Sequence, residues 1–208
     1  MAAKKPSSRT RKESPSCNEL LVLELQEIHS AENQLARVLP RLMKSAQSEK
    51  LQQMLQQREE QGGRLIEEIE SALEEMDESP GRKKNVAAEG LINDAREHVQ
   101  ELEQGPALDS VLIAAIQKTE HYCVAAWGTA RSLAQATSQK PVVRSMERAL
   151  EEGKKLDEQL TQLAEAEVTP ALISEESGDE GTSEDKEDGS GQSRSRNKGG
   201  DTGRRVSG

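Results

Sequence analysis

The chain has 208 residues, of which 28 are Lys or Arg and 38 are Asp or Glu, and its formal net charge is −10. No run of eighteen apolar residues occurs, which excludes a membrane-spanning helix, and with one Trp, one Tyr and no Phe we expect no base-stacking nucleic-acid surface. This length accommodates one domain with tails, and the many Leu, Ala, Glu, Gln and Lys residues of its middle part predict an all-α fold.

The N-terminal tail, residues 1–15, contains five basic residues, one acidic residue and almost nothing apolar. We expect it to be disordered, because it cannot bury enough apolar surface to offset the entropy of ordering. No apolar run follows the basic residues, so we expect no secretory signal, and the low cysteine count suits a cytoplasmic protein. The acidic middle part predicts no nucleic-acid partner beyond weak contacts of the basic tail segments.

Two long helices are predicted next. Ser16-Cys17-Asn18-Glu19 has the spacing of a capping box and marks the start of the first, and we expect Pro40 to kink its last turns. Its seam, a stripe at alternating steps of four and three, consists of Leu21, Leu25, Ile28, Glu32, Leu35, Leu39, Leu42 and Ala46. The seam of the second helix, which ends at a turn over 77–81, consists of Leu51, Leu55, Arg58, Gly62, Leu65, Ile69, Ala72 and Met76.

A shorter amphipathic helix is predicted over about 86–102, a third long helix over about 106–137 and a fourth over about 139–167. One apolar stripe of the third consists of Ile113, Ile116, Glu120, Cys123, Trp127, Ala130 and Ala134. The stripe of the fourth consists of Val143, Met146, Leu150, Gly153, Asp157, Leu160 and Ala164. Residues 171–208 are first acidic and then basic, with many Ser and Gly, so we expect a second disordered tail and place the folded domain at residues 16–170.

The connections between the long helices predict their topology. Very short turns join the first helix to the second and the third to the fourth, so each pair should form an antiparallel hairpin, whereas about 30 residues separate the two hairpins. Two short connections separated by a long one are typical of a ferritin-like four-helix bundle with one crossover. In this chain the crossover contains the shorter helix.

Four charged residues occupy seam positions where Leu or Ile is expected: Glu32, Arg58, Glu120 and Asp157. Counting from the two hairpin turns places them at one level of the bundle. Carboxylates that face inward from three helices are the ligands that a di-iron or di-manganese site requires, which makes the three acids candidate metal ligands. Arg58 in the same layer is the cation with which a protein neutralises buried carboxylates without a metal.

The histidines do not complete such a metal site. Di-metal bundles of this kind use Glu-x-x-His pairs, and none of the three His residues has a Glu three positions before it. His29 lies three residues before Glu32, which is the reverse of the Glu-x-x-His order, and we expect its side chain at the flank of the seam. The sequence also lacks a phosphate-binding loop, a hydrolase elbow and a zinc-spaced Cys pair, and Cys123 is expected to be a small core residue. We therefore expect no catalytic residue and no cofactor, with iron or manganese as the alternative.

Four stretches carry a resemblance to a known family: His29-Ser-Ala-Glu-Asn-Gln-Leu, Ala88-Glu-Gly-Leu-Ile, Glu120-His-Tyr-Cys-Val-Ala-Ala-Trp-Gly-Thr and Leu150-Glu-Glu-Gly-Lys-Lys-Leu-Asp. Over about residues 18–166 the chain resembles the YciE/YciF-type family of bacterial ferritin-like proteins. The resemblance implies a ferritin-like bundle associated with bacterial stress responses and a dinuclear carboxylate site.

The sequence departs from this family at four ligand positions. Where the family's ligand set implies a His, this chain has Arg58, and where it implies Glu, this chain has Gln61, Cys123 and Gly153. We therefore expect a non-catalytic bundle with a structural or interacting role, in which a charge network replaces the metal and the partner is a second copy or another protein. The first alternative is a metalloprotein with residual ferroxidase or peroxide-handling activity, which uses the three carboxylates with His29 or Cys123. The second is a scaffold whose charged tails are the functional part.

Overall fold

A computed structural model describes residues 14–180, and over this range the chain forms helices and no strand. The elements are α1 (Cys17–Ser45), α2 (Glu49–Glu75), α3 (Val86–Glu101), α4 (Pro106–Ala136), α5 (Lys140–Leu163), the π-helical turn η1 (Ala164–Val168) and α6 (Thr169–Glu180). The predicted all-α class and the five predicted helices are thus confirmed. Within the described residues, no helix is both long and apolar enough to cross a membrane.

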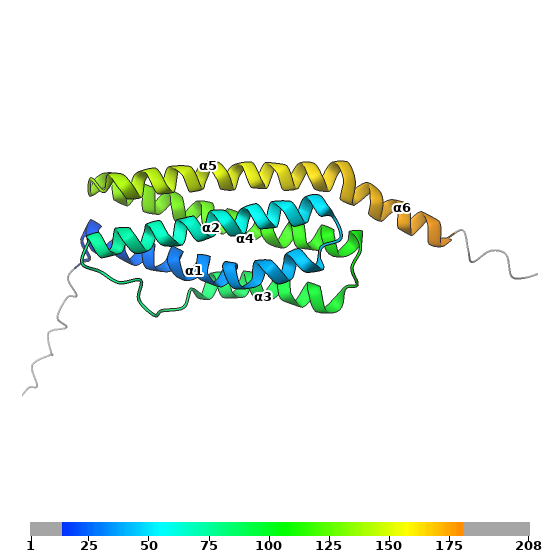
Figure 1. The fold of residues 1–208 in the computed structure, drawn as a ribbon, viewed down its shortest axis with the longest axis horizontal. Coiled ribbons are helices and arrows are strands. Elements are labelled where there is room, and N and C mark those ends of the chain that lie inside the picture. The colour runs from blue at the N-terminus through cyan, green and yellow to red at the C-terminus, as the bar shows by residue number, and fades with distance from the viewer. Residues whose placement is uncertain (1–13, 181–208) are drawn as a thin grey trace, which may run out of the picture.

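The four long helices form a closed bundle of two antiparallel hairpins. α1 pairs with α2 and α4 pairs with α5, while α1 also packs on α4 and α2 on α5. The crossover carries α3, which lies outside this four-helix core against α1 and α4 (Figure 1). This arrangement confirms the predicted bundle with one long crossover.

Capping side chains mark the starts of α1 and α2. Ser16 and Glu19 form the predicted capping box at the start of α1, with Glu19 N donating to Ser16 Oγ at 3.2 Å and Ser16 N donating to Glu19 Oε2 at 2.7 Å. Ser48 caps α2 by accepting a single hydrogen bond from Leu51 N at 3.3 Å. α1 continues as one helix through Pro40 to Ser45.

The predicted seams of α1, α2 and α4 lie inside the bundle. All the seam residues of α1 and the predicted stripe of α4 are buried, and so is the α2 seam as far as Ala72, with Met76 half-buried. The buried residues include the charged side chains of Glu32, Arg58 and Glu120, which are 1%, 2% and 1% exposed. The charged layer predicted from the periodicity therefore exists on three of the four helices.

The C-terminal helix extends beyond the position expected from composition. The helix does not end at Pro170 but widens into the π turn η1 and continues as α6 to Glu180. Proline removes one amide donor and crowds the carbonyl four residues earlier, here that of Ala166, and this carbonyl belongs to the widened turn. The expected tails otherwise fall on residues 1–13 and 181–208, which lie outside the described residues.

Candidate functional site

The centre of the bundle holds a buried ion-pair network that joins three helices. Arg58 of α2 donates from Nη1 and Nη2 to the two carboxylate oxygens of Glu32 on α1, at 2.9 and 3.0 Å. Its Nε donates to Glu120 Oε1 on α4 at 2.5 Å. The contact to Glu32 is a two-point, fork-to-fork pairing, which fixes the guanidinium plane as well as its position.

Burial makes the electrostatics of this network strong. Burial by itself lowers the pKa of Arg58, but the carboxylates of Glu120 and Glu32 outweigh it and hold the pKa of Arg58 above its ordinary value. For Glu120 burial dominates, and its pKa is raised above 4.5 although Arg58 opposes the shift. One cation thus faces two buried carboxylates.

Cys123 completes the inner surface of the network. Its side chain is buried, and Arg58 Nη2 lies 3.9 Å from Sγ. Burial and the nearby Glu32 carboxylate raise the pKa of the Cys123 thiol well above its ordinary value, against the effect of Arg58. A thiol held in its neutral form is a poor nucleophile and a poor metal ligand, so Cys123 is a core residue, as its position in the α4 stripe predicts.

Two glycines provide the space for the network. A Cβ atom on Gly62 would lie 2.9 Å from both Arg58 Nη1 and Glu32 Oε2. On α5, a Cβ atom on Gly153 would lie 2.6 Å from Cζ3 of Trp127 and 3.3 Å from Glu120 Oε2. The Trp127 ring therefore lies directly over Gly153, and the Arg58 guanidinium carbon lies 5.6 Å from the centre of that ring, within the range of a cation–π contact.

Asp157 does not lie in the buried layer with Glu32 and Glu120. Its side chain is 29% exposed and accepts a hydrogen bond from Gln117 Nε2 at 3.0 Å, with His121 Nε2 3.4 Å away. The reason is that the buried face of α5 differs by one residue from the predicted stripe. After Gly153 the next buried residue is Leu156 and not Asp157. The sequence prediction that Asp157 belongs to the inner site is wrong on this point.

The other candidate ligands lie at the edge of the site. Gln61 is half-buried and lines a small cavity of about 10 Å³ that also borders Arg58 and Trp127. His29 lies on the flank of α1, as predicted, where Nε2 contacts Glu70 Oε1 at 2.8 Å. Among the described residues, neither side chain forms a hydrogen bond or ion pair with the buried network.

The residues present do not fit a dinuclear metal centre. Both oxygens of Glu32 and one oxygen of Glu120 already accept hydrogen bonds from Arg58, whose guanidinium lies between the two carboxylates. The second oxygen of Glu120, Oε2, has no hydrogen-bond partner among the described residues, and it faces Gly153, where an added Cβ would lie 3.3 Å away. Within residues 14–180 no three His, Cys, Asp or Glu side chains are grouped so as to hold a metal ion.

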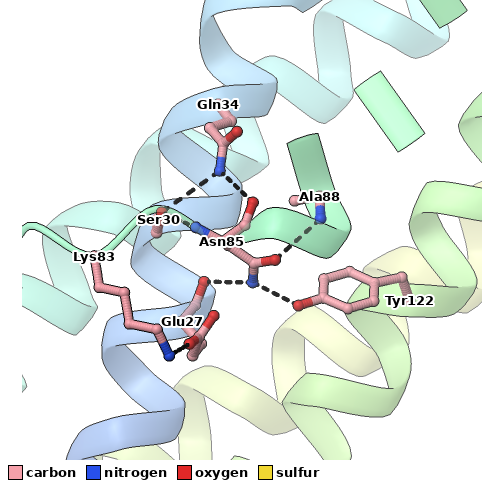
Figure 2. Close-up of polar contacts among 7 residues, drawn as sticks. All are labelled: Glu27, Ser30, Gln34, Lys83, Asn85, Ala88 and Tyr122. Carbon is pink, nitrogen blue, oxygen red and sulfur yellow. Dashed lines mark hydrogen bonds and ion pairs between the residues drawn. The ribbon is translucent and has the colours of Figure 1, made fainter. Parts of the chain in front are cut away.

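Two buried polar residues outside the seams also organise the bundle, and our sequence analysis did not single them out. Asn85 is 1% exposed, caps α3 through Ala88 N and hydrogen-bonds to α1 and α4 (Figure 2). Asp109, 2% exposed on α4, accepts hydrogen bonds from Gln47 N and Ser48 N at 2.8 and 2.7 Å and so supports the start of α2. Asn85 has a sequence signal, since Asn is a preferred N-cap, whereas the role of Asp109 depends on a contact between distant segments.

Comparisons with known proteins match this bundle. A family model described as a domain of unknown function (DUF892) matches residues 16–173, from the N-cap of α1 into α6. Protein YciF of Escherichia coli (strain K12) is 38% identical over 141 residues, which are 67% of this chain and 85% of that protein.

Two solved structures are similar to this chain. The crystal structure of the E. coli stress protein YciF has a TM-score of 0.69 at 36% identity and covers 73% of this chain and 96% of that chain. YcfI from Rhodopseudomonas palustris, described as a candidate structural protein, has a TM-score of 0.67 at 27% identity and covers 74% of this chain and 98% of that chain.

Proposed function

The chain belongs to the DUF892 family and is similar to YciF, and from this premise we propose that it is a non-catalytic helical-bundle protein of the stress response with a structural or interacting role. Its resemblance to the YciE/YciF-type family is thereby confirmed. The stress-related role is carried over from the E. coli stress protein YciF, with which the match spans most of both chains.

The position of Arg58 is the observation that carries the proposal. A di-metal enzyme of this fold needs carboxylates with free oxygens that face each other across the bundle core. Here the guanidinium takes up three of the four oxygens of Glu32 and Glu120. Its positive charge also opposes the approach of a divalent cation. The network therefore supports a stabilising role for these residues rather than a catalytic one.

Location and partner are further parts of this proposal. We place the protein in the cytoplasm, which suits the free thiols of Cys17 and Cys123 in the described part of the chain. The interacting role requires a protein partner, either a second copy or another protein. Sedimentation equilibrium of the full chain over a range of concentrations tests the first, and a chain that stays monomeric throughout would remove it from the proposal.

Metal content of the full chain tests the non-catalytic role. The protein is purified from cultures supplemented with iron and manganese, analysed for both elements, and then titrated anaerobically with ferrous ion. We expect well below one ion per chain and no oxidation of ferrous ion above the rate in buffer alone.

The matched variant for this test is Glu120→Gln, which removes one of the two buried carboxylates and preserves its shape. If the wild-type chain binds two ions and Glu120→Gln binds none, the metalloprotein alternative replaces our proposal. If both proteins bind the same trace amount, the metal is not held by the buried network, and the proposal stands.

A further inference from the structure

α3 is held to the rest of the molecule by few apolar contacts. It buries three side chains, those of Ala88, Ile92 and Ala95, with Val99 partly buried, whereas α2 and α5 bury eight residues each. Two of the three are alanines, which contribute little apolar surface. The hydrophobic contribution to holding α3 on α1 and α4 is therefore small compared with that between the four long helices.

One buried side chain supplies the main polar attachment of α3. The Asn85 side chain accepts from Ala88 N at 3.0 Å, which caps α3, and donates to the Glu27 carbonyl on α1 at 3.1 Å and to Tyr122 Oη on α4 at 2.5 Å. Figure 2 shows these three contacts radiating from one amide group. A single residue thus connects the start of α3 with both helices beneath it.

The backbone of Asn85 adds two contacts to α1. Its N–H donates to Ser30 Oγ at 2.9 Å, and its carbonyl accepts from Gln34 Nε2 at 3.0 Å (Figure 2). The same carbonyl also accepts from Glu89 N at 3.1 Å in the first turn of α3, so Asn85 has six hydrogen bonds in all, in a position that is 1% exposed. If one of these hydrogen bonds broke while Asn85 stayed buried, a polar group would be left without a partner. We therefore expect the hydrogen bonds of Asn85 to break together.

Apart from one part-buried contact of Gln104, the remaining polar contacts that the crossover makes to other helices are exposed. Lys83 pairs with Glu27 at 2.9 Å, with side chains 77% and 29% exposed, and Lys118 pairs with Asp94 at 3.1 Å, with side chains 56% and 43% exposed. At the far end, Gln104 Nε2 donates to the Ala46 carbonyl at 2.9 Å. Exposed ion pairs of this kind hold weakly, because water screens them and the long side chains must be ordered.

From this distribution of contacts we propose that α3 is a strap which opens as a unit while the four-helix bundle stays folded, and that Asn85 is the latch that keeps it closed. Segments with few buried apolar contacts open at a lower free energy than the core of a protein. Opening uncovers the faces of α1 and α4 on which α3 lies. The inference is independent of the proposed function, since it concerns neither the buried Arg58 network nor a metal.

Hydrogen–deuterium exchange of the full chain, read by mass spectrometry, tests this inference. In the wild type we expect the amides of residues 86–101 to exchange faster than the central amides of α2 and α5, and at a rate that depends little on low concentrations of urea. In Asn85→Ala we expect exchange of α3 to accelerate by about tenfold or more, with α2 and α5 unchanged. Exchange of α3 at the same rate and urea dependence as α2 and α5 in the wild type would overturn the proposal.

Three further variants separate the latch from a general loss of stability. Asn85→Asp keeps the cap on Ala88 N but loses both donor contacts, and Tyr122→Phe loses only the contact to α4, so we expect an intermediate acceleration in each. Asn93→Ala removes an exposed Asn from the same helix and should leave exchange unchanged. Equal acceleration of all helices in Asn85→Asp and Tyr122→Phe would show that Asn85 supports the whole bundle and is no latch.

Discussion

Arg58 stabilises the bundle by compensating two carboxylates that have left water. Moving a charge into a protein interior carries a large desolvation penalty, and a buried pair offsets it only with good geometry and additional hydrogen bonds. The fork-to-fork contact with Glu32 and the single contact with Glu120 provide both. The consequence is an asymmetry, because removing one partner is far more harmful than replacing the whole network with apolar side chains.

We predict that Arg58→Ala lowers the unfolding free energy by about 3–5 kcal/mol, since it leaves Glu32 and Glu120 buried without a cation. The matched control is Arg64→Ala on the same helix, which removes an exposed pair with Glu152 at 3.1 Å and should lower it by under about 1 kcal/mol. Urea denaturation followed by circular dichroism measures both. Similar, small losses in the two variants would contradict the compensating role of Arg58.

The burial of Glu120 should make the unfolding free energy depend on pH. Its pKa in the folded protein lies above the ordinary value of 4.5 because of burial, so the folded state binds the proton more tightly than the unfolded state. The contribution of Glu120 to stability is therefore fully present below 4.5 and is lost as the pH rises through the folded pKa. We expect the unfolding free energy of Glu120→Gln, relative to wild type, to increase as the pH is raised from about 4 to about 8.

The comparison variant for this pH series is Glu68→Gln. Burial raises the pKa of Glu68, but hydrogen bonds from Arg148 and Ser145 outweigh it and lower the pKa below 4.5. The stability that Glu68 contributes is accordingly present above 4.5 and is lost as the pH falls. The two variants should thus show opposite trends, and parallel trends would mean that the Glu120 carboxylate is not desolvated as the structure implies.

At the scale of the helices, glycines allow side chains of neighbouring helices to lie close to the helix backbone. Glycine in a helix interior is less favourable than alanine by about 1 kcal/mol, yet Gly62, Gly63 and Gly153 all occupy such positions. The structure distinguishes them, because only Gly62 and Gly153 are closed in by neighbouring side chains. Gly63 has no atom within 4 Å of an added Cβ.

We predict that Gly62→Ala and Gly153→Ala each lower the unfolding free energy by about 1–3 kcal/mol, since the new methyl group overpacks the Arg58 pair or the Trp127 ring. Gly63→Ala, one residue from Gly62, should instead raise it by up to about 1 kcal/mol through helix propensity alone. Thermal denaturation of the three variants is sufficient. A gain in all three would show that the neighbours give way without strain.

For most of the helices, the sequence pattern also predicts which residues are buried. Periodicity predicts the seams of α1, α2 and α4 and the burial of Glu32, Arg58 and Glu120, because each of these helices has one continuous stripe toward the core. In α5 a step of four from Gly153 selects Asp157, whereas a step of three selects Leu156. Both steps occur in a helix of 3.6 residues per turn, so the pattern alone does not decide between them. The packing of α5 against its neighbours buries Leu156.

For the whole molecule, the bundle topology is predictable from connection lengths, and the contacts that lock it are not. Short turns define the hairpins, and the long crossover defines their relation. The role of Asp109 and the contacts of Asn85 beyond its helix cap arise only when segments 37 to 62 residues away along the chain come together. Composition likewise placed the end of the domain at Pro170, although the helix continues, because low apolar content does not by itself prevent a helix that extends from a folded one.

The bundle needs only the first part of its C-terminal helix for stability. Val168 in η1 is 4% exposed, whereas the large hydrophobic side chain of Ile173 in α6 is 57% exposed, and α6 extends away from the bundle (Figure 1). We therefore compare truncated chains that span residues 14–180, 14–170 and 14–163. The first two should melt within about 3 °C of each other, because the residues removed between them bury little apolar surface.

The chain that ends at residue 163 also loses Val168, whose burial stabilises the fold by roughly 1.5–3 kcal/mol. We expect its melting temperature to fall by about 4–10 °C relative to the chain that ends at 170, in line with the usual scaling for a domain of this size. Differential scanning calorimetry at one protein concentration makes the comparison. If the larger fall instead separates the chains that end at 180 and 170, α6 itself is docked on the bundle, and the functional boundary of the domain lies beyond Pro170.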